Sequence, residues 1–219
     1  LDVFASHGKI YEASASAMFN VPIEDCGKGT EYRVKGKYGE LAFGFGGSVH
    51  AYRRFAGEDG ENQTDNEIKS LVYSWREASP NIVKFWDNLN NAAMSAIYYP
   101  GDIFYANKGI AYQVVDSWLT CRLPSGRCLM YYKPEIGTNK FGKPGITYLN
   151  KEDNKLVRVD TYGGKLCENV VQATARDALG EAMINLQQYR DILLIVLHVH
   201  DEIIAKTTKD NADEKLALM

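Results

Sequence analysis

The chain has 219 residues, of which 45% are hydrophobic and 24% are charged, a composition typical of globular proteins. No apolar run approaches the ~20 residues of a membrane helix, and the N-terminus lacks the features of a signal peptide, so no membrane partner is expected. The net charge of −3 argues mildly against nucleic acid, although basic residues gather at 33–37 and 122–143. The four cysteines form no CxxC pair and no zinc pattern, which indicates free thiols in an intracellular, cytoplasmic setting.

The first hundred residues are predicted to be helical, because apolar positions recur at helical spacing between Gly and Pro breaks. Glycines at 44, 46 and 47 are expected to end the second helix. The expected helices cover 2–20, a segment capped by Thr30 and running through Leu41 toward Phe45, 65–78, and 80–98 with Ser79 as its cap.

The second half of the chain changes in pattern. Short β-prone runs and turn signals over 103–162 predict a small antiparallel insert. An amphipathic helix is predicted over 165–186, followed by a β-hairpin and a further helix over 209–218. The expected strands lie at 112–115, 118–122, 128–132, 192–199 and 203–207. The predicted fold class is therefore α+β, mostly helical, with a small antiparallel sheet and an acidic β-hairpin.

The turn of this hairpin is His200-Asp201-Glu202, between two very apolar strands. A solvated turn is the ordinary interpretation, because Asp is favoured in turns. The functional interpretation is a magnesium site, since Mg²⁺ binds one or two protein carboxylates together with substrate phosphates. His198 and His200 share one side of an extended strand, which also permits a transition-metal site, although two histidines are few ligands.

Basic side chains recur at intervals of four on the second expected helix. Arg33 and Lys37 begin a stripe that turns apolar at Leu41 and aromatic at Phe45. The stripe is either a solvated face or a grip for a triphosphate, since Arg offers a bidentate fork and Lys a mobile charge. A base stacked at the apolar end, with close backbone approach at Gly46, fits that order. The chain has no GxxxxGK[ST] motif, which excludes a Walker loop.

A polar stripe accompanies the apolar face of the helix expected at 165–186. Asn169, Gln172 and Arg176 are spaced three and four apart, with Glu168 beside them. The stripe is either a polar outer face or a surface that reads base edges, since Asn and Gln can hydrogen-bond minor-groove acceptors.

These patterns occur in an order that is more specific than any one of them. The series resembles the family A (DNA polymerase I-like) DNA polymerases of the bacteriophage type, and the resemblance covers nearly the whole chain. Gly8–Phe19 and Leu123-Pro124-Ser125-Gly126-Arg127 are also similar to elements of that family. The ordered motifs are Arg33-x3-Lys37-x7-Phe45-Gly46, then Thr161-Tyr162-Gly163-Gly164-Lys165-Leu166 leading into 168–177, then His200-Asp201-Glu202.

The resemblance implies template-directed transfer of a deoxynucleotide to a primer 3′-hydroxyl in DNA replication. The partners it implies are primer–template DNA and deoxynucleoside triphosphates. Residues 1–100 would belong to the fingers, with a nucleotide-binding helix at 31–46. Residues 101–219 would form a palm portion that contains the β-rich insert 103–162 and the acidic hairpin 192–207.

The resemblance also assigns the nucleotide site. Arg33 and Lys37 would hold the triphosphate, and Lys37 is a candidate proton donor to the leaving pyrophosphate. Leu41 stands where many relatives carry an aromatic residue. The remaining implied nucleotide contacts are Tyr11, Leu41, Phe45 and Gly46.

The metal and DNA contacts follow from the same resemblance. Asp201 would bind two catalytic Mg²⁺ ions with Glu202 in support, and His200 would lie near the primer end. Gln172 and Asn169 would touch the minor groove of the primer–template duplex. Two-metal catalysis stabilises the attacking and the leaving oxygen, and such a site needs carboxylates from more than one strand.

The family supplies another aspartate from an Asp-Tyr-Ser-x-x-Glu motif, which this sequence lacks. In the family, that motif lies just upstream of the position where this chain begins. The chain also begins with Leu1 and not with Met. The sequence is therefore expected to be a fragment of a longer protein, with little or no polymerase activity on its own.

Two other functions fit parts of the sequence. A metal-dependent phosphoesterase or nuclease could use His198, His200, Asp201 and Glu202, and would not need the basic helix near the acidic turn. A non-catalytic nucleic-acid-binding module would need no second aspartate.

Overall fold

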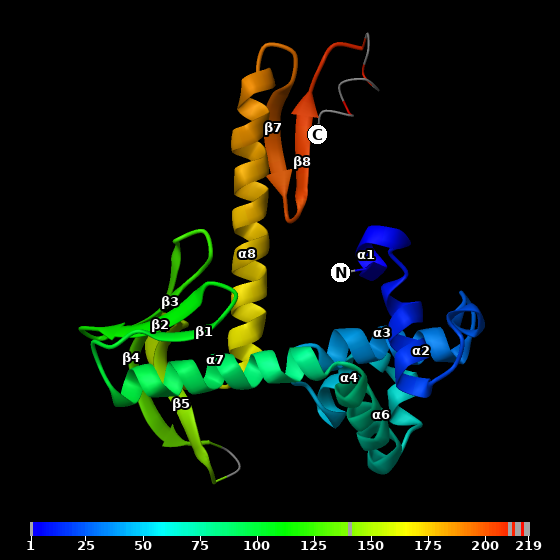
Figure 1. The fold of residues 1–219 in the computed structure, drawn as a ribbon, viewed down its shortest axis with the longest axis horizontal. Helices are drawn as coiled ribbons and strands as arrows, with labels where there is room; N and C mark the ends of the chain where they lie inside the picture. The colour runs from blue at the N-terminus through cyan, green and yellow to red at the C-terminus, as the bar shows by residue number, and fades with distance from the viewer. Residues whose placement is uncertain (1, 140–141, 210–211, 213–215, 217–219) are drawn as a thin grey trace.

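The computed structural model describes residues 2–139, 142–209, 212 and 216. It has an α+β fold, with a six-stranded antiparallel sheet and a separate two-stranded sheet. Figure 1 shows an N-terminal helical unit, the larger sheet packed on the long helix α7, and an upright helix α8 that leads to the second sheet. No helix in the part of the chain that the structure describes is long and apolar enough to cross a membrane.

Short helices build the N-terminal unit. The prediction of a single helix over 2–20 is wrong, because the structure has two helices there with a break at Gly8. The N–H of Gly8 donates to the carbonyl of Val3 at 2.7 Å. The two helices between residues 49 and 61 were not predicted. The elements of the unit are α1 (Asp2–Ser6), α2 (Ile10–Phe19), η1 (Ile23–Cys26), α3 (Glu31–Phe43), α4 (Val49–Ala56), α5 (Glu58–Glu61) and α6 (Asp65–Ala78).

The helix caps are partly as predicted. Thr30 caps α3, since its hydroxyl oxygen accepts the N–H of Arg33 at 3.3 Å. Helix α7 spans Pro80–Tyr98 with proline in its first turn, as predicted. Ser79 makes no side-chain cap bond, because its backbone (φ −125°, ψ 49°) lies outside the extended region in which a cap side chain reaches the first turn.

The larger sheet is an antiparallel meander in which each strand pairs with the next along the chain. It confirms the predicted insert at 103–162, although the strand that begins at Cys128 runs on to Thr138. The strands are β1 (Phe104–Asn107), β2 (Ile110–Val115), β3 (Trp118–Arg122), β4 (Cys128–Thr138), β5 (Pro144–Glu152) and β6 (Lys155–Thr161).

One hydrophobic core runs from the helical unit into the sheet. Trp75 of α6 and Trp86 of α7 stack with ring centroids 6.0 Å apart and planes 9° apart. On the sheet side, Tyr112 and Leu119 are fully buried against α7. All four cysteines are free thiols, as expected. Helix α7 is therefore the element that joins the two larger parts.

Helix α8 (Gly163–Leu186) begins two positions before the predicted start at Lys165. Its first turn touches backbone, because a β-carbon on Gly163 would overlap the carbonyl of Trp86, and one on Gly164 would overlap the carbonyl of Phe45. Only glycine allows this approach. The start of α8 is thereby fixed against α7 and against the loop that follows α3.

The chain then passes through η2 (Gln187–Tyr189) into a hairpin of β7 (Leu194–Val199) and β8 (Glu202–Lys206). Most of the hairpin is exposed, including Leu194 at 55% and Leu197 at 54%. The helix expected over 209–218 falls almost entirely outside the described residues.

The close contact at Gly163 gives a stability test. Gly163→Ala should lower the free energy of unfolding by about 1–3 kcal/mol, the usual cost of forcing extra volume into a packed contact. Gly180→Ala is the matched control on the same helix, because a β-carbon at Gly180 meets nothing within 4 Å. It should stabilise the protein by up to ~1 kcal/mol through helix propensity. Urea denaturation followed by circular dichroism measures both, and equal effects would contradict the packing.

Candidate functional site

The basic helix α3 packs on α2 through its arginine. The Nε–H of Arg33 donates to Glu12 Oε1 at 2.7 Å, and the Arg33 guanidinium carbon lies 5.5 Å from the centre of the Tyr11 ring. The helices approach closely because α3 carries Gly36 at the contact, where a β-carbon would overlap the Tyr11 carbonyl. Arg33 is thus held at the helix interface, with 26% of its side chain exposed.

Glu12 is a site residue that the sequence analysis missed. It is 8% exposed, and a buried carboxylate needs a cationic or hydrogen-bonding partner. The hydrogen bond from Arg33 lowers the pKa of Glu12 below its ordinary value. Its position on α2 among small and apolar residues was the available signal, but its partner is 21 positions away in sequence.

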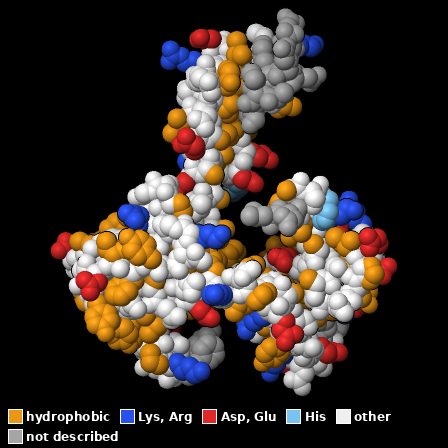
Figure 2. All heavy atoms as spheres, viewed as in Figure 1, with side chains coloured by type: hydrophobic (Ala, Val, Ile, Leu, Met, Phe, Trp, Pro, Cys, Tyr) orange, Lys and Arg blue, Asp and Glu red, His pale blue; other side chains and the backbone are white. Residues whose placement is uncertain are grey.

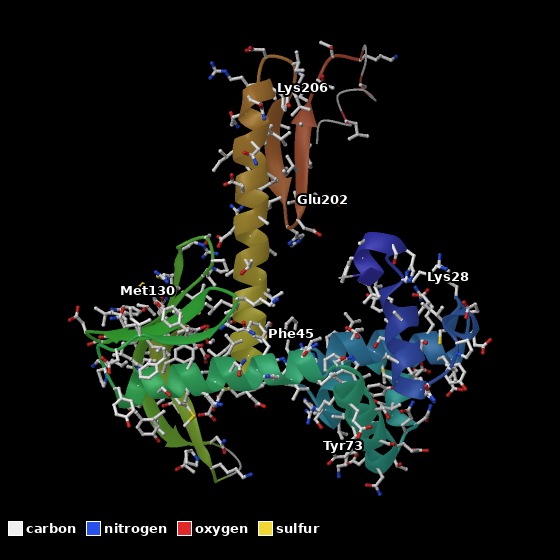
Figure 3. All side chains as sticks on the ribbon, in the orientation of Figure 1. Lys28, Phe45, Tyr73, Met130, Glu202 and Lys206 are labelled. Carbon is white, nitrogen blue, oxygen red and sulfur yellow. The ribbon has the colours of Figure 1, made fainter. Side chains whose placement is uncertain are left out.

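The predicted stripe lies only partly on α3, because the helix ends at Phe43 and not at residue 46, so Phe45 lies in the turn that follows the helix. Lys37 is exposed and forms no ion pair with any residue of the described ranges. Leu41 is 40% exposed, so the surface changes from basic to apolar along the helix. Phe45 is half-buried against the core. Figure 3 shows it where α7 meets the start of α8.

The acidic hairpin differs in one detail from the prediction. Val199 pairs with Glu202, so the turn is His200-Asp201 and Glu202 belongs to β8. His200 adopts a φ of 51°, the left-handed geometry that tight hairpin turns use. His200, Asp201 and Glu202 are all exposed. The tip therefore presents two adjacent carboxylates to solvent on a hydrogen-bonded hairpin.

The donor set at this tip fits part of a magnesium site. Mg²⁺ accepts one or two protein carboxylates and completes its shell with water and phosphate oxygens. Asp201 and Glu202 could supply the two carboxylates and leave the other positions open. Over 2–139, 142–209, 212 and 216, no three His, Cys, Asp or Glu residues are grouped closely enough to hold a metal ion. The transition-metal site suggested by His198 and His200 therefore gains no support.

The hairpin tip and the helical unit border the same open space. Figure 2 shows a hollow between the column of α8 with the hairpin and the helical unit, with acidic and histidine side chains of the tip at its edge. In Figure 3, the turn end of the hairpin, where Glu202 is labelled, faces the end of α8 near which Phe45 lies. No hydrogen bond or ion pair recorded for the described residues joins the hairpin to α3.

The polar stripe of α8 lines a cavity of about 410 Å³ between that helix and β4. The amide of Asn169 donates to the Tyr131 hydroxyl at 3.0 Å, so its orientation is fixed. The amide of Gln172 donates to the Glu168 carboxylate at the long distance of 3.5 Å, and Gln172 is exposed. Gln172 is therefore more available to a partner than Asn169.

A polar cluster that the sequence analysis did not assign closes one end of this cavity. Asp177 of α8 accepts hydrogen bonds from the Ser125 hydroxyl and from the Arg127 Nε–H, both at 2.6 Å. Arg127 also donates to the Ala173 carbonyl at 2.8 Å. The Ser125 and Arg127 bonds lower the pKa of Asp177. The cluster ties the β3–β4 turn to α8 and so fixes the cavity.

The Glu12–Arg33 pair predicts a pH dependence of stability. Because the folded pKa of Glu12 is lowered, its contribution is present above the ordinary glutamate pKa of about 4.3 and is lost as pH falls through the folded value. The stability lost in Glu12→Gln should therefore shrink from pH 7 toward pH 3 in urea denaturation. Glu61→Gln is the control, because Glu61 is exposed and forms no ion pair with another described residue. An effect of Glu12→Gln that stays constant with pH would contradict the pairing.

Comparison with known proteins bears on the sequence resemblance. No protein-family model matches the chain. Over an alignment of 225 positions that includes the whole chain, it is 41% identical to the DNA polymerase of Bacillus phage SP02. The chain covers 34% of that polymerase, about a third of its length. The expected similarity to a phage DNA polymerase is confirmed.

Proposed function

We propose that the chain is part of a DNA-directed DNA polymerase of the family A type, which transfers deoxynucleotides to a primer 3′-hydroxyl in DNA replication. The observation that carries the proposal is the identity of 41% with a phage DNA polymerase along the entire chain. The geometry supports it, since an exposed basic helix and an exposed acidic hairpin are present on one fold. Primer–template DNA and deoxynucleoside triphosphates are the proposed partners.

The α3 stripe is the proposed nucleotide site. Glu12 accepts the Nε–H of Arg33, so both Nη groups of Arg33 can donate to phosphate oxygens. Lys37, exposed one turn further on, adds a mobile charge and is the proposed proton donor to pyrophosphate. The apolar surface from Leu41 to Phe45 would receive the base. Tyr11, beneath the Arg33 guanidinium, keeps that cation in place.

The hairpin is the proposed metal end of the site. Asp201 and Glu202 would hold Mg²⁺, which when bound would activate the primer hydroxyl and stabilise the leaving oxygens. The hydrogen-bonded strands on either side fix the two carboxylates relative to each other. His200 in the turn would lie near the primer end.

The α8 cavity is the proposed contact with the duplex. Gln172 can donate to minor-groove acceptors, which every base pair offers, so such a contact does not depend on sequence. Asn169 would contribute less, since Tyr131 already accepts its amide N–H. This division of roles follows from the hydrogen bonds that each side chain makes in the free chain.

A phosphoesterase that uses the hairpin alone is the competing function. Among the described residues no hydrogen bond or ion pair joins the hairpin to α3, which fits a phosphoesterase as well as it fits a polymerase awaiting substrate. Both functions would need metal ligands beyond Asp201 and Glu202, since the described part of the chain groups no three suitable ligands. The polymerase similarity is therefore the stronger guide.

Lys37 provides the test of the nucleotide site. Lys37→Ala should weaken binding of a fluorescent dATP analogue with Mg²⁺ by roughly 10-fold or more, because a hydrogen bond to a charged group contributes about 1.5–3 kcal/mol. Lys35→Ala is the matched control. It removes the same charge from the same helix, but Lys35 is paired with Glu31.

The control variant should change the affinity by less than about 2-fold, the scale of a screened surface charge. Equal weakening in Lys35→Ala and Lys37→Ala would mean that nucleotide is attracted by general positive charge, and would contradict a specific grip. Circular dichroism of both variants confirms that α3 remains folded.

A further inference from the structure

A pocket with a volume of about 470 Å³ lies on the helical unit, where the start of α3 meets α4, α5 and the segment after α5. This volume is within the range of roughly 300–1,000 Å³ that small-molecule pockets have. Lys35 and Tyr38 of α3 line it, whereas Arg33 and Lys37 do not. The pocket is therefore on the side of α3 away from the proposed nucleotide site.

The wall of this pocket contains a buried hydroxyl without a partner. Tyr52 of α4 is 0% exposed, and its hydroxyl makes no hydrogen bond to the described residues. The side chain of Gln63 approaches this hydroxyl, but no hydrogen bond of acceptable geometry forms between them. Because buried polar groups are nearly always hydrogen-bonded, an open hydroxyl in the wall of a pocket indicates a ligand that bonds it.

A carboxylate in the same pocket selects the charge of that ligand. Asp59 of α5 accepts the Tyr38 hydroxyl at 3.1 Å through Oδ2, and its Oδ1 accepts no hydrogen bond from the rest of the described chain. Lys35, the cation of the described pocket wall, is paired with Glu31. Asp59 therefore keeps an oriented negative charge that no cation of the wall compensates.

The surroundings of the pocket favour a cation over a phosphate. Glu58 and Glu61 flank Asp59 on α5, and both are exposed and form no ion pair with another described residue. The positive end of α3 also borders the pocket, but Glu31 in its first turn and the Thr30 cap offset it. A phosphate would meet like charges here, so nucleic acid is a poor match for this pocket.

The apolar part of the wall fits the stem of an alkylammonium group. Val34 is 37% exposed, and the ring of Tyr38 stands edge-on to that of Tyr52, with centroids 5.8 Å apart and planes 87° apart. Aromatic rings attract ammonium groups, and the methylene stems that carry them pack on apolar surface. An ammonium has three donors and no acceptor, which matches the oxygens of Tyr52, Asp59 and Asn62.

We propose that this pocket binds a primary ammonium group on an aliphatic stem. The ammonium would donate to Tyr52 and Asp59, and the stem would lie against Val34 and Tyr38. Free polyamines and the lysine side chains of proteins both carry such a group, and the test separates these two sources. The inference goes beyond the proposed polymerase function and does not depend on it, because none of these residues belongs to the proposed nucleotide, metal or DNA contacts.

The test titrates the full chain with spermidine and, separately, with a blocked Ala-Lys-Ala tripeptide, at an ionic strength of about 0.15 M. Dissociation constants come from the NMR shifts of the backbone amides of Gly29 and Asn62, two residues of the wall. Tyr52→Phe and Asp59→Asn should each weaken binding by about 10-fold, because each removes an acceptor for a charged donor. Glu58→Gln is the matched control, since it removes the same charge from α5 outside the wall, and should change the affinity by less than about 2-fold.

Tyr52→Phe should not lower the melting temperature, since the hydroxyl it removes has no partner in the free chain. If it nevertheless fails to fold, Asp59→Asn decides the test. Binding of spermidine alone that these variants weaken assigns the site to free polyamines, and binding of the tripeptide alone assigns it to a lysine of a partner protein.

Three results overturn the ammonium site. They are no binding of either probe, binding that Tyr52→Phe and Asp59→Asn leave unchanged, and equal weakening by Asp59→Asn and Glu58→Gln, which would mean general attraction to an acidic surface. Inorganic phosphate that shifts the same signals more than either probe also overturns it, in favour of an anion. The nucleotide affinity of the Lys37→Ala variant is measured separately, so the polymerase proposal stands or falls on its own test.

Discussion

The contact on which the architecture depends is the backbone approach at the start of α8. Gly163 lies against the Trp86 carbonyl and Gly164 against the Phe45 carbonyl, so three parts of the chain meet there without intervening side chains. Helix α7 carries the sheet and the helical unit on one hydrophobic core. Helix α8 leads from this junction to the acidic hairpin. Each proposed functional surface is therefore positioned relative to this one packed junction.

The proposed site combines fixed and free groups. Arg33 is held by Glu12 and Tyr11, Asn169 by Tyr131, whereas Lys37 is exposed and unpaired among the described residues. Fixed groups lose little conformational freedom when a ligand binds, and a mobile lysine can follow a moving charge. The hairpin carries the two exposed carboxylates of Asp201 and Glu202, on an element separate from this cationic surface. The chain thus presents opposite charges on separate elements, as the proposed phosphate transfer would use.

Local sequence patterns predicted most helices and strands, but they did not predict the side-chain contacts between these elements. The bounds of α6 and α7, the β-rich insert and the hairpin follow from periodicity, proline and turn residues that lie near one another in sequence. The Arg33–Glu12 bond joins residues 21 apart and the Arg127–Asp177 bond residues 50 apart, so both depend on packing that no local pattern encodes. The break at Gly8 and the strand position of Glu202 were missed because each depends on one backbone dihedral or one step of register.

Template-dependent selection of the nucleotide tests the central claim most directly. The chain with a primer–template is titrated with each deoxynucleoside triphosphate in Mg²⁺, and the four dissociation constants are compared. A polymerase site that ends in the Leu41–Phe45 surface should bind the nucleotide complementary to the template base several-fold tighter than the other three, and the preference should change with the template base. Equal affinity for all four, or binding that ignores the DNA, would contradict the account.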